Sequence, residues 1–330
     1  MTARRARAVA HPNIALVKYW GNANSELRIP SNGSISLTLD GLETDTLVVF
    51  RADLANDEVL VDEQRTSAST EARVGRVLDH VRGMAGIEAF ARVESRNSFP
   101  SGAGLASSAS AFAALAAAAT AAAGLALEPE ELSRVARLGS GSACRSIWGG
   151  YVEWLAGSDH AGSYSLQIAP AEHWDLRDVV AVMSRQAKAV GSSEGHDRAR
   201  SSPLQPPRVA DAPRRLAICR RAILARDFEA LAAVVEQDSD LMHEVMATSS
   251  PPLNYSLPST TALRQAVPAW RAEGLPVAYT QDAGPNLHLL CLPEAVGVVI
   301  ERVRTFDGVV DTLHARPGGP PRQIEIPNRG

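Results

Sequence analysis

Cysteine is scarce in this 330-residue chain, and its three cysteines, Cys144, Cys219 and Cys291, lie far apart. An odd number of widely spaced cysteines fits neither a disulfide framework nor a cysteine-ligated metal site. Long apolar runs are also missing, because the longest weakly polar stretch, residues 111–127, is mostly alanine broken by Thr120 and Gly124. That stretch is too short and too mild to span a bilayer, so we expect a buried helix there.

The N-terminus, MTARRARAVAHP, has basic residues but no apolar segment after them, so no export signal is expected. An excess of one charge is missing as well, since 33 Lys and Arg face 37 Asp and Glu for a net charge of −4. Such a balance argues against nucleic acid or a membrane surface as partner and favours a small molecule. We expect a cytoplasmic protein, long enough for two domains.

The hydrophobic pattern predicts strands mixed with helices without regular alternation, which is typical of an α+β fold. The turn-forming residues Asp40 and Gly41 lie between two strand-like runs and predict a hairpin over 35–50. The proline-rich stretch 191–213 predicts a mobile segment. We place two lobes at 1–180 and 181–330. The other expected elements are helices over 70–84, 129–139, 214–246, 261–271 and 293–303, strands over 90–95 and 151–154, and a strand pair within 276–292.

The stretch PSGAGLASSASAF, residues 100–112, joins a flexible loop to the alanine-rich helix. Gly102 and Gly104 allow backbone conformations closed to other residues, and Ser107 and Ser108 stand where the helix begins. Free N–H groups at a helix start stabilise a nearby anion by about 0.3 to 1 kcal/mol per charge, so the loop fits a phosphate cradle. An ordinary helix cap after a loop is the alternative.

A second loop of small residues, GSGSACRSIWGG, covers residues 139–150. Ser140 and Ser142 offer hydroxyl groups, and Arg145 offers a planar guanidinium that suits a carboxylate or a phosphate. The alternative is that this segment is an ordinary turn with an arginine on the surface.

Two further stretches carry charged residues, HPNIALVKYWGN near the N-terminus and TQDAGPN near residue 282. Lys18 can be an aliphatic stem packed beside aromatics, or a cation aimed at a transferring phosphoryl group. Asp282 can be a turn residue before Gly284 and Pro285, or a catalytic carboxylate.

The four motifs HPNIALVKYWG, FPSGAGLASSASAFAAL, GSGSACRSIWGGYVEW and DAGPN, in this order, resemble the mevalonate diphosphate decarboxylases of the GHMP small-molecule kinase superfamily. The resemblance spans about residues 8 to 290. Pro100 to Ser108 matches the superfamily's phosphate loop, Pro-x-x-x-Gly-Leu-x-Ser-Ser. It implies the GHMP kinase fold, with the active cleft between two lobes, and often a homodimer.

The resemblance also implies an activity. Family members use ATP and Mg²⁺ to phosphorylate the 3-hydroxyl of a 5-phosphorylated mevalonate, and then lose phosphate and CO₂ to leave an isopentenyl ester of the mevalonate pathway. Carried onto this chain, Asp282 orients and deprotonates the hydroxyl, and Lys18 acts on that carboxylate and on the phosphoryl group. Pro100, Gly102 and Gly104 belong to the ATP loop.

The remaining roles carried over concern binding. Ser107 and Ser108 hold ATP phosphates, with Ser108 also a metal ligand. Arg145 pairs with the substrate carboxylate, and Asn13 adds a hydrogen bond. The phosphorylated tail of the substrate is contacted by Tyr19, Ser140, Ser142 and Ser192.

The sequence departs from the family where that tail would bind. Many members read Gly-Lys after the Tyr-Trp pair, whereas this chain has Gly21-Asn22, and Ser193 stands where some bacterial members have arginine. Fewer cations favour a smaller negative charge, so we expect 5-phosphomevalonate as substrate and isopentenyl phosphate as product. The alternatives are a diphosphomevalonate decarboxylase making isopentenyl diphosphate, a kinase without decarboxylation, and a non-catalytic metabolite sensor.

Overall fold

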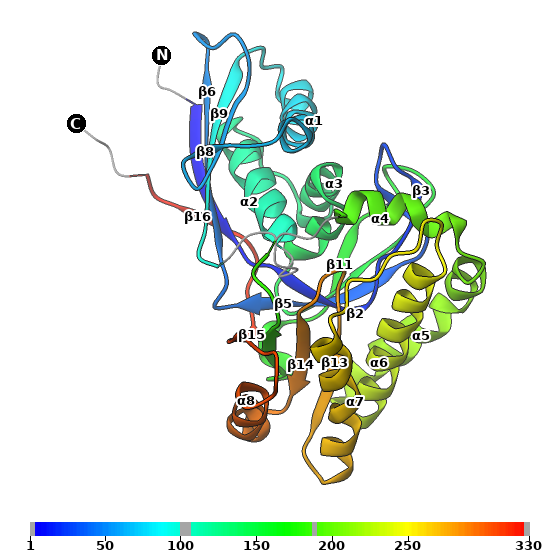
Figure 1. Cartoon of the computed structure of the whole chain (residues 1–330). Helices are drawn as coiled ribbons and strands as arrows, with labels where there is room; N and C mark the ends of the chain where they lie inside the picture. The colour runs from blue at the N-terminus through cyan, green and yellow to red at the C-terminus, as the bar shows by residue number, and fades with distance from the viewer. Residues whose placement is uncertain (1–3, 100–106, 187–189, 327–330) are drawn as a thin grey trace.

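The computed structural model describes residues 4–99, 107–186 and 190–326, and Pro100, Gly102 and Gly104 therefore lie outside the described residues (Figure 1). Its strands form two large sheets and one small one, with helices packed on both large sheets. This arrangement confirms the α+β prediction. In the described part of the chain no helix has both the length and the apolar character needed to cross a membrane.

The first sheet has the strand order β16-β1-β6-β9-β7-β8. Helices α1, α2 and α3 pack together beside it, and α2 lies against β1 and β6 (Figure 1). The alanines of α2 carry no bulk beyond Cβ, so the helix is almost wholly buried. The bounds are β1 Arg4–Ala10, β6 Thr44–Arg51, β7 Glu58–Val61, β8 Gln64–Arg65, α1 Ala68–Ala85, β9 Phe90–Asn97, α2 Ser107–Ala122, α3 Pro129–Gly139 and β16 Arg322–Ile324.

Local signals explain the helices of this half. The buried residues of α1, Val74, Val77, Leu78 and Val81, have the spacing of one helix face, which confirms the predicted helix. The Ser67 side chain accepts a hydrogen bond from the Thr70 N–H at its start.

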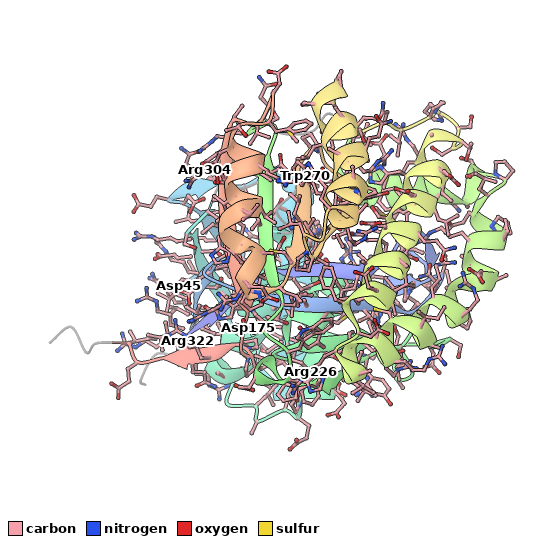
Figure 2. The ribbon with its side chains drawn as sticks, turned by 90° about the horizontal axis from the view of Figure 1, so that it is seen from below. Asp45, Asp175, Arg226, Trp270, Arg304 and Arg322 are labelled. Carbon is pink, nitrogen blue, oxygen red and sulfur yellow. The ribbon has the colours of Figure 1, made fainter. Side chains whose placement is uncertain are left out.

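The second sheet has the order β11-β10-β5-β15-β12-β14-β13, and β2 also pairs with β5. Helices α5 to α8 lie along it, as the view from below shows (Figure 2), and the Arg302 guanidinium of α8 stacks over the Trp270 ring of α7. The bounds are β2 Asn13–Val17, β5 Ser34–Asp40, β10 Tyr151–Trp154, β11 Ser165–Ala169, β12 Arg177–Val182, α4 Ser192–Arg198, α5 Gln205–Ala225, α6 Phe228–Ala247, α7 Pro258–Ala272, β13 Val277–Thr280, β14 Leu287–Cys291, α8 Val296–Arg304 and β15 Asp311–Pro317.

Short elements complete the fold: a two-stranded sheet of β3 Asn22–Asn24 and β4 Ile29–Pro30, and the 3₁₀ helices η1 Gly141–Ser146, η2 Ala171–His173, η3 Ala199–Ser201 and η4 Pro293–Ala295. The second sheet takes strands from both ends of the chain. The division into lobes at residue 180 stays a prediction.

The prediction for residues 35–50 was wrong, while the mobility predicted for residues 191–213 stays a prediction. Residues 35–50 do form two strands, but β5 pairs with β2, β10 and β15 while β6 pairs with β1 and β9, so no hairpin exists. Alternation reports which face of a strand is buried and not which strand lies beside it. The segment 191–213 is mostly helical, in α4, η3 and the start of α5. Pro206 lies in the first turn of α5, where a backbone N–H would have no acceptor within the helix, so the missing N–H of proline costs no hydrogen bond.

Candidate active site

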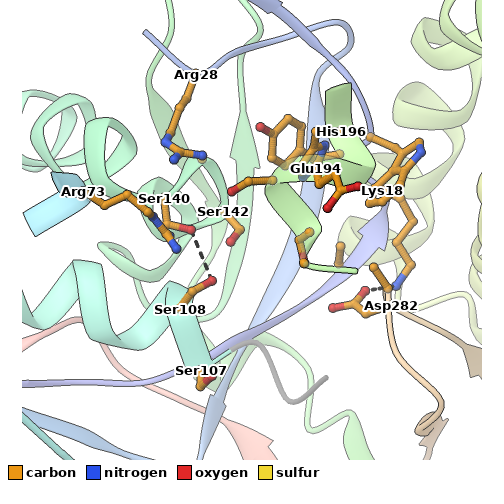
Figure 3. A pocket seen from close by; sticks show the side chains of 18 of the residues that line it. Lys18, Arg28, Arg73, Ser107, Ser108, Ser140, Ser142, Glu194, His196 and Asp282 are labelled. Carbon is orange, nitrogen blue, oxygen red and sulfur yellow. Dashed lines mark hydrogen bonds and ion pairs between the residues drawn. The ribbon is translucent and has the colours of Figure 1, made fainter. Parts of the chain in front are cut away.

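A cavity of about 950 Å³ lies between the two large sheets, walled by α1, α2, η1, the end of β2, α4 and the β13–β14 connection (Figure 3). Every predicted site residue that the structure describes lines it. These residues are Asn13, Lys18, Tyr19, Ser107, Ser108, Ser140, Ser142, Arg145, Ser192 and Asp282. The fold therefore brings together side chains from separate stretches of sequence.

Lys18 and Asp282 form an ion pair. From the sequence alone, the lysine could have been a surface residue and the aspartate a turn residue. Lys18 Nζ lies 2.6 Å from Asp282 Oδ1; the lysine side chain is 1% exposed and the aspartate 25%. Burial alone would raise the pKa of Asp282, but the charges of Lys18, His288 and Arg145 and the hydrogen bond from Lys18 hold it below its usual value. Asp282 is thus an ionised carboxylate at neutral pH.

The backbone of Lys18 is held by a buried network that the sequence did not reveal. Its N–H donates to Asp238 Oδ2 at 2.6 Å, and its carbonyl accepts from Arg208 Nη2 at 2.9 Å. Asp238 is itself paired with the fully buried Arg215 at 2.7 Å. Because these groups lie on α5 and α6, the two helices set the direction in which Lys18 leaves β2.

Arg145 is buried, at 3% exposure, in the 3₁₀ helix η1. Its Nε donates to Asn13 Oδ1 at 3.2 Å and its Nη1 donates to Ser34 Oγ at 2.6 Å, while Asn13 Nδ2 donates to Ser146 Oγ at 2.7 Å. Within the described residues no carboxylate forms an ion pair with Arg145. A buried guanidinium held only by neutral groups is suited to an anionic ligand.

The described part of helix α2 runs from Ser107, where the sequence predicted a helix after the loop, and its first turn carries no acidic residue. The Ser108 hydroxyl lies 3.3 Å from the Ser140 hydroxyl, so the start of α2 and the second loop meet at the cavity (Figure 3). An anion bound at the start of α2 would meet backbone N–H groups there, which is the chemistry of a phosphate cradle.

Three arginines at the cavity were missed by the sequence analysis: Arg28, Arg73 and Arg76. Arg73 Nε donates to Gly139 O at 2.9 Å, and its guanidinium lies over the Phe112 ring. Burial, followed by the charges of Arg28 and Arg76, lowers the pKa of Arg73 to about 10. None of the three forms an ion pair within residues 4–99, 107–186 and 190–326. The sequence offered one indication, which concerned two of them: Arg73 and Arg76 are three residues apart in a predicted helix and therefore lie on the same helix face.

Helix α4 covers one side of the cavity with Ser192, Glu194 and His196. The His196 ring stacks on the Tyr19 ring with centroids 4.0 Å apart, and its Nδ1 accepts the Gly21 N–H at 3.0 Å. The segment expected to be mobile is thus part of the site.

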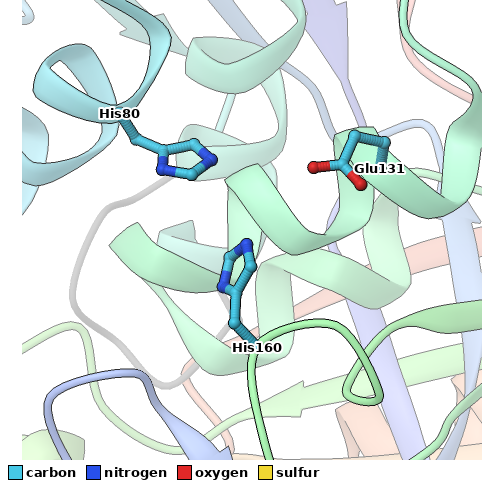
Figure 4. A group of neighbouring side chains, drawn as sticks. All are labelled: His80, Glu131 and His160. Carbon is cyan, nitrogen blue, oxygen red and sulfur yellow. The ribbon is translucent and has the colours of Figure 1, made fainter. Parts of the chain in front are cut away.

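A second cluster of metal-binding residue types lies away from the cavity and consists of His80, Glu131 and His160 (Figure 4). Arg137 Nη2 donates to His160 Nδ1 at 2.9 Å, and Arg134 Nη1 donates to Glu131 Oε2 at 2.7 Å. A histidine that binds a metal normally gives its second nitrogen to an acceptor. Two guanidinium groups also oppose a divalent cation, so we assign no metal to this cluster.

Comparison with known families matches two models. A diphosphomevalonate decarboxylase-like N-terminal domain covers residues 10–165, and a mevalonate 5-diphosphate decarboxylase C-terminal domain covers residues 178–321. Curated relatives include the diphosphomevalonate decarboxylase of Aspergillus fumigatus, 37% identical over 93% of this chain and 81% of that protein. The human diphosphomevalonate decarboxylase is 35% identical over 88% of this chain and 78% of its own length.

Solved structures resemble the whole fold. The mevalonate diphosphate decarboxylase of Staphylococcus aureus superposes with a TM-score of 0.93 at 35% identity, over 98% of this chain and 99% of that one. MDDEF in complex with MVAPP, AMPPCP and magnesium superposes with a TM-score of 0.90 at 35% identity and the same coverage.

Proposed function

The chain belongs to the mevalonate diphosphate decarboxylase family of the GHMP kinase superfamily, and we propose that it converts 5-diphosphomevalonate and ATP into isopentenyl diphosphate, ADP, phosphate and CO₂. It is thus an ATP-dependent carboxy-lyase with the GHMP kinase fold. The observation that carries the proposal is the Lys18–Asp282 ion pair, which shares one cavity with the Arg145 guanidinium and the start of α2.

In the first step Asp282 accepts the hydrogen bond of the substrate's 3-hydroxyl, and takes its proton as the oxygen bonds to the γ-phosphorus of ATP. The bond between that phosphorus and the β-phosphate oxygen breaks, and ADP leaves. Lys18 lies 2.6 Å from Asp282 and stabilises the negative charge of the reacting group. Phosphoryl transfer is accelerated mainly by positioning of the groups and by stabilisation of the negative charge.

In the second step the C3–O bond to the new phosphate breaks while the C1–C2 bond releases CO₂, and its electron pair forms the C2–C3 double bond. Arg145 orients the departing carboxylate through its guanidinium, with Asn13 holding the Nε side in place. The neutral partners of Arg145 leave its charge for that carboxylate.

ATP and Mg²⁺ fit the residues at the cavity. Among the described residues no group of three carboxylate or histidine ligands lines it. A magnesium ion at the cavity would thus be held mainly by ATP phosphate oxygens, as this ion commonly is, with the Ser108 hydroxyl as a protein ligand. It would supply positive charge to the phosphates, and Ser107 and the N–H groups of α2 would bind the remaining oxygens.

The substrate expected from the sequence, 5-phosphomevalonate, is not supported, because the relatives are diphosphomevalonate decarboxylases. The charge count behind that expectation considered Asn22 and Ser193 but omitted Arg28, Arg73 and Arg76. These arginines line the same cavity as Ser140 and Tyr19 and can balance a diphosphate. We therefore propose the diphosphate, with Tyr19, Ser140, Ser142 and Ser192 as its further contacts.

The test is an incubation of the purified chain with ATP, MgCl₂ and either substrate, followed by measurement of CO₂, phosphate and ADP. Release of all three with a higher kcat/KM for the diphosphate supports the proposal. ADP without CO₂ would indicate a kinase, and binding without ADP a sensor. The suggested homodimer is tested separately by light scattering on the same sample.

A further inference from the structure

Arg28 occupies an unusual position in the turn between β3 and β4. Its backbone is left-handed, with φ 51°, and its side chain runs inward so that the residue is only 8% exposed. The Nε group donates to Leu138 O, 3.3 Å away, at the end of α3, where a cation also interacts favourably with the helix dipole. Figure 3 shows its guanidinium entering the cavity on the side where Arg73 and Ser140 lie.

The charge of Arg28 has no balancing carboxylate in contact among the residues described. Burial lowers the pKa of Arg28, the charge of Tyr19 raises it, that of Arg76 lowers it, and that of Asp197 raises it. Arginine nevertheless stays charged at neutral pH. A buried cation surrounded by other cations is costly unless an anion joins it. The arrangement is therefore built for an anionic ligand.

The guanidinium also lies where the tail of the substrate would bind. Tyr19 is among the groups that act most strongly on it, and the Tyr19 hydroxyl donates to Asn22 Oδ1. Asn22 pairs with Pro30 in the β3–β4 sheet, so Asn22 and Arg28 belong to the same small hairpin. Asn22 itself brings no charge.

We propose that Arg28 is a specificity-determining residue that binds the diphosphate tail, so that the cation missing at residue 22 is supplied from the other side of the hairpin. The inference rests on the proposed function, because it names the group that selects the substrate of that reaction. Arg73, held by the neighbouring carbonyl of Gly139, completes the anion site.

The test compares Arg28→Gln, Arg28→Lys and the double variant Asn22→Lys/Arg28→Gln with the unchanged chain. Arg96→Gln is the matched control, since Arg96 is exposed and pairs with Glu63 outside the cavity. For Arg28→Gln we expect KM for the diphosphate to rise about 10- to 100-fold, the loss of one charge-assisted hydrogen-bonded group, with kcat little changed. Its preference for diphosphate over monophosphate should fall about 10-fold.

Arg28→Lys, which keeps the charge but loses the planar fork, should fall between these values, and the double variant should recover most of the diphosphate affinity. Thermal unfolding of each variant identifies any that fails to fold. A KM and a preference within twofold of the unchanged chain in folded Arg28→Gln would overturn the inference.

A binding measurement separates this inference from the proposed function. Inorganic pyrophosphate is titrated calorimetrically into the full chain, with ADP and MgCl₂ present to fill the nucleotide site. Weaker binding in Arg28→Gln and unchanged binding in Arg96→Gln support the anion site even if neither mevalonate ester is turned over. Equal binding in all variants would refute it even if the decarboxylase activity is found.

Discussion

Replacing Asp282 with asparagine removes the proposed base and its charge while keeping the size of the side chain. General base catalysis contributes about 10²- to 10⁴-fold to a rate, so kcat should fall by that factor. Nucleotide binding should stay within a few-fold, because Ser107 and Ser108 lie at a different part of the cavity.

The same substitution weakens the ion pair with Lys18. The pair is short, at 2.6 Å, and the lysine is 1% exposed, but the carboxylate is 25% exposed and the amide oxygen of the substituted side chain would still accept from Nζ. We therefore expect a loss of about 1 kcal/mol in the free energy of unfolding, because the hydrogen bond from the lysine remains and only the attraction between the opposite charges is lost. Urea unfolding measures this loss.

Single-turnover ADP formation and CO₂ release, measured with nucleotide affinity, separate chemistry from folding. Asp240→Asn is the matched control. Asp240 lies on α6, accepts a hydrogen bond from the Tyr279 hydroxyl at 2.8 Å, and does not line the cavity. Asp282→Asn activity within a few-fold of the unchanged chain would reduce Asp282 to a turn residue. Equal activity losses in both variants would show that the effect comes from stability.

Three further predictions follow from the site. Arg145→Lys keeps the charge but loses the bidentate fork, so KM for the mevalonate ester should rise about 10-fold or more in steady-state assays, and an unchanged KM would contradict the carboxylate contact. Gly141→Ala would place Cβ 2.8 Å from the Tyr19 ring, so the ring must shift and substrate binding should weaken more than nucleotide binding; equal effects on both would contradict a local shift. The pKa of Asp282 is lowered in the folded chain, so its stabilising effect is complete above the unfolded value of about 3.9 and is lost as pH falls through the lower folded value. The difference in unfolding free energy between the unchanged chain and Asp282→Asn should thus be constant from about pH 6 to 8 and shrink below about pH 4, and a difference that changes near neutral pH would refute this assignment.

Local sequence determined the elements whose signals are complete within a few residues. The spacing of Val74, Val77, Leu78 and Val81 predicted α1, because a helix brings these positions onto one face whatever surrounds it. The alanine-rich helix α2 was predicted from an equally local signal. The motifs around Lys18, Arg145 and Asp282 also identified the family, because these short stretches occur in the same order along the chain as in family members.

Only tertiary structure decided which of these segments meet. β5 and β6 alternate like a hairpin, yet each is buried in a different sheet, since pairing depends on strands from distant parts of the chain. Residues 191–213 read as irregular, but α4 is fixed on the cavity by the stacking of His196 on Tyr19.

The charge of the site was decided in the same way. From the sequence, Asn22 and Ser193 carry no charge, and we therefore expected a substrate with a monophosphate tail. The fold brings Arg28 from a turn and Arg73 from α1 to adjacent carbonyls at the end of α3, where both guanidinium groups face one cavity. Electrostatic attraction depends on distance in space, so residues far apart in the chain act on one ligand, and no local pattern records that they do.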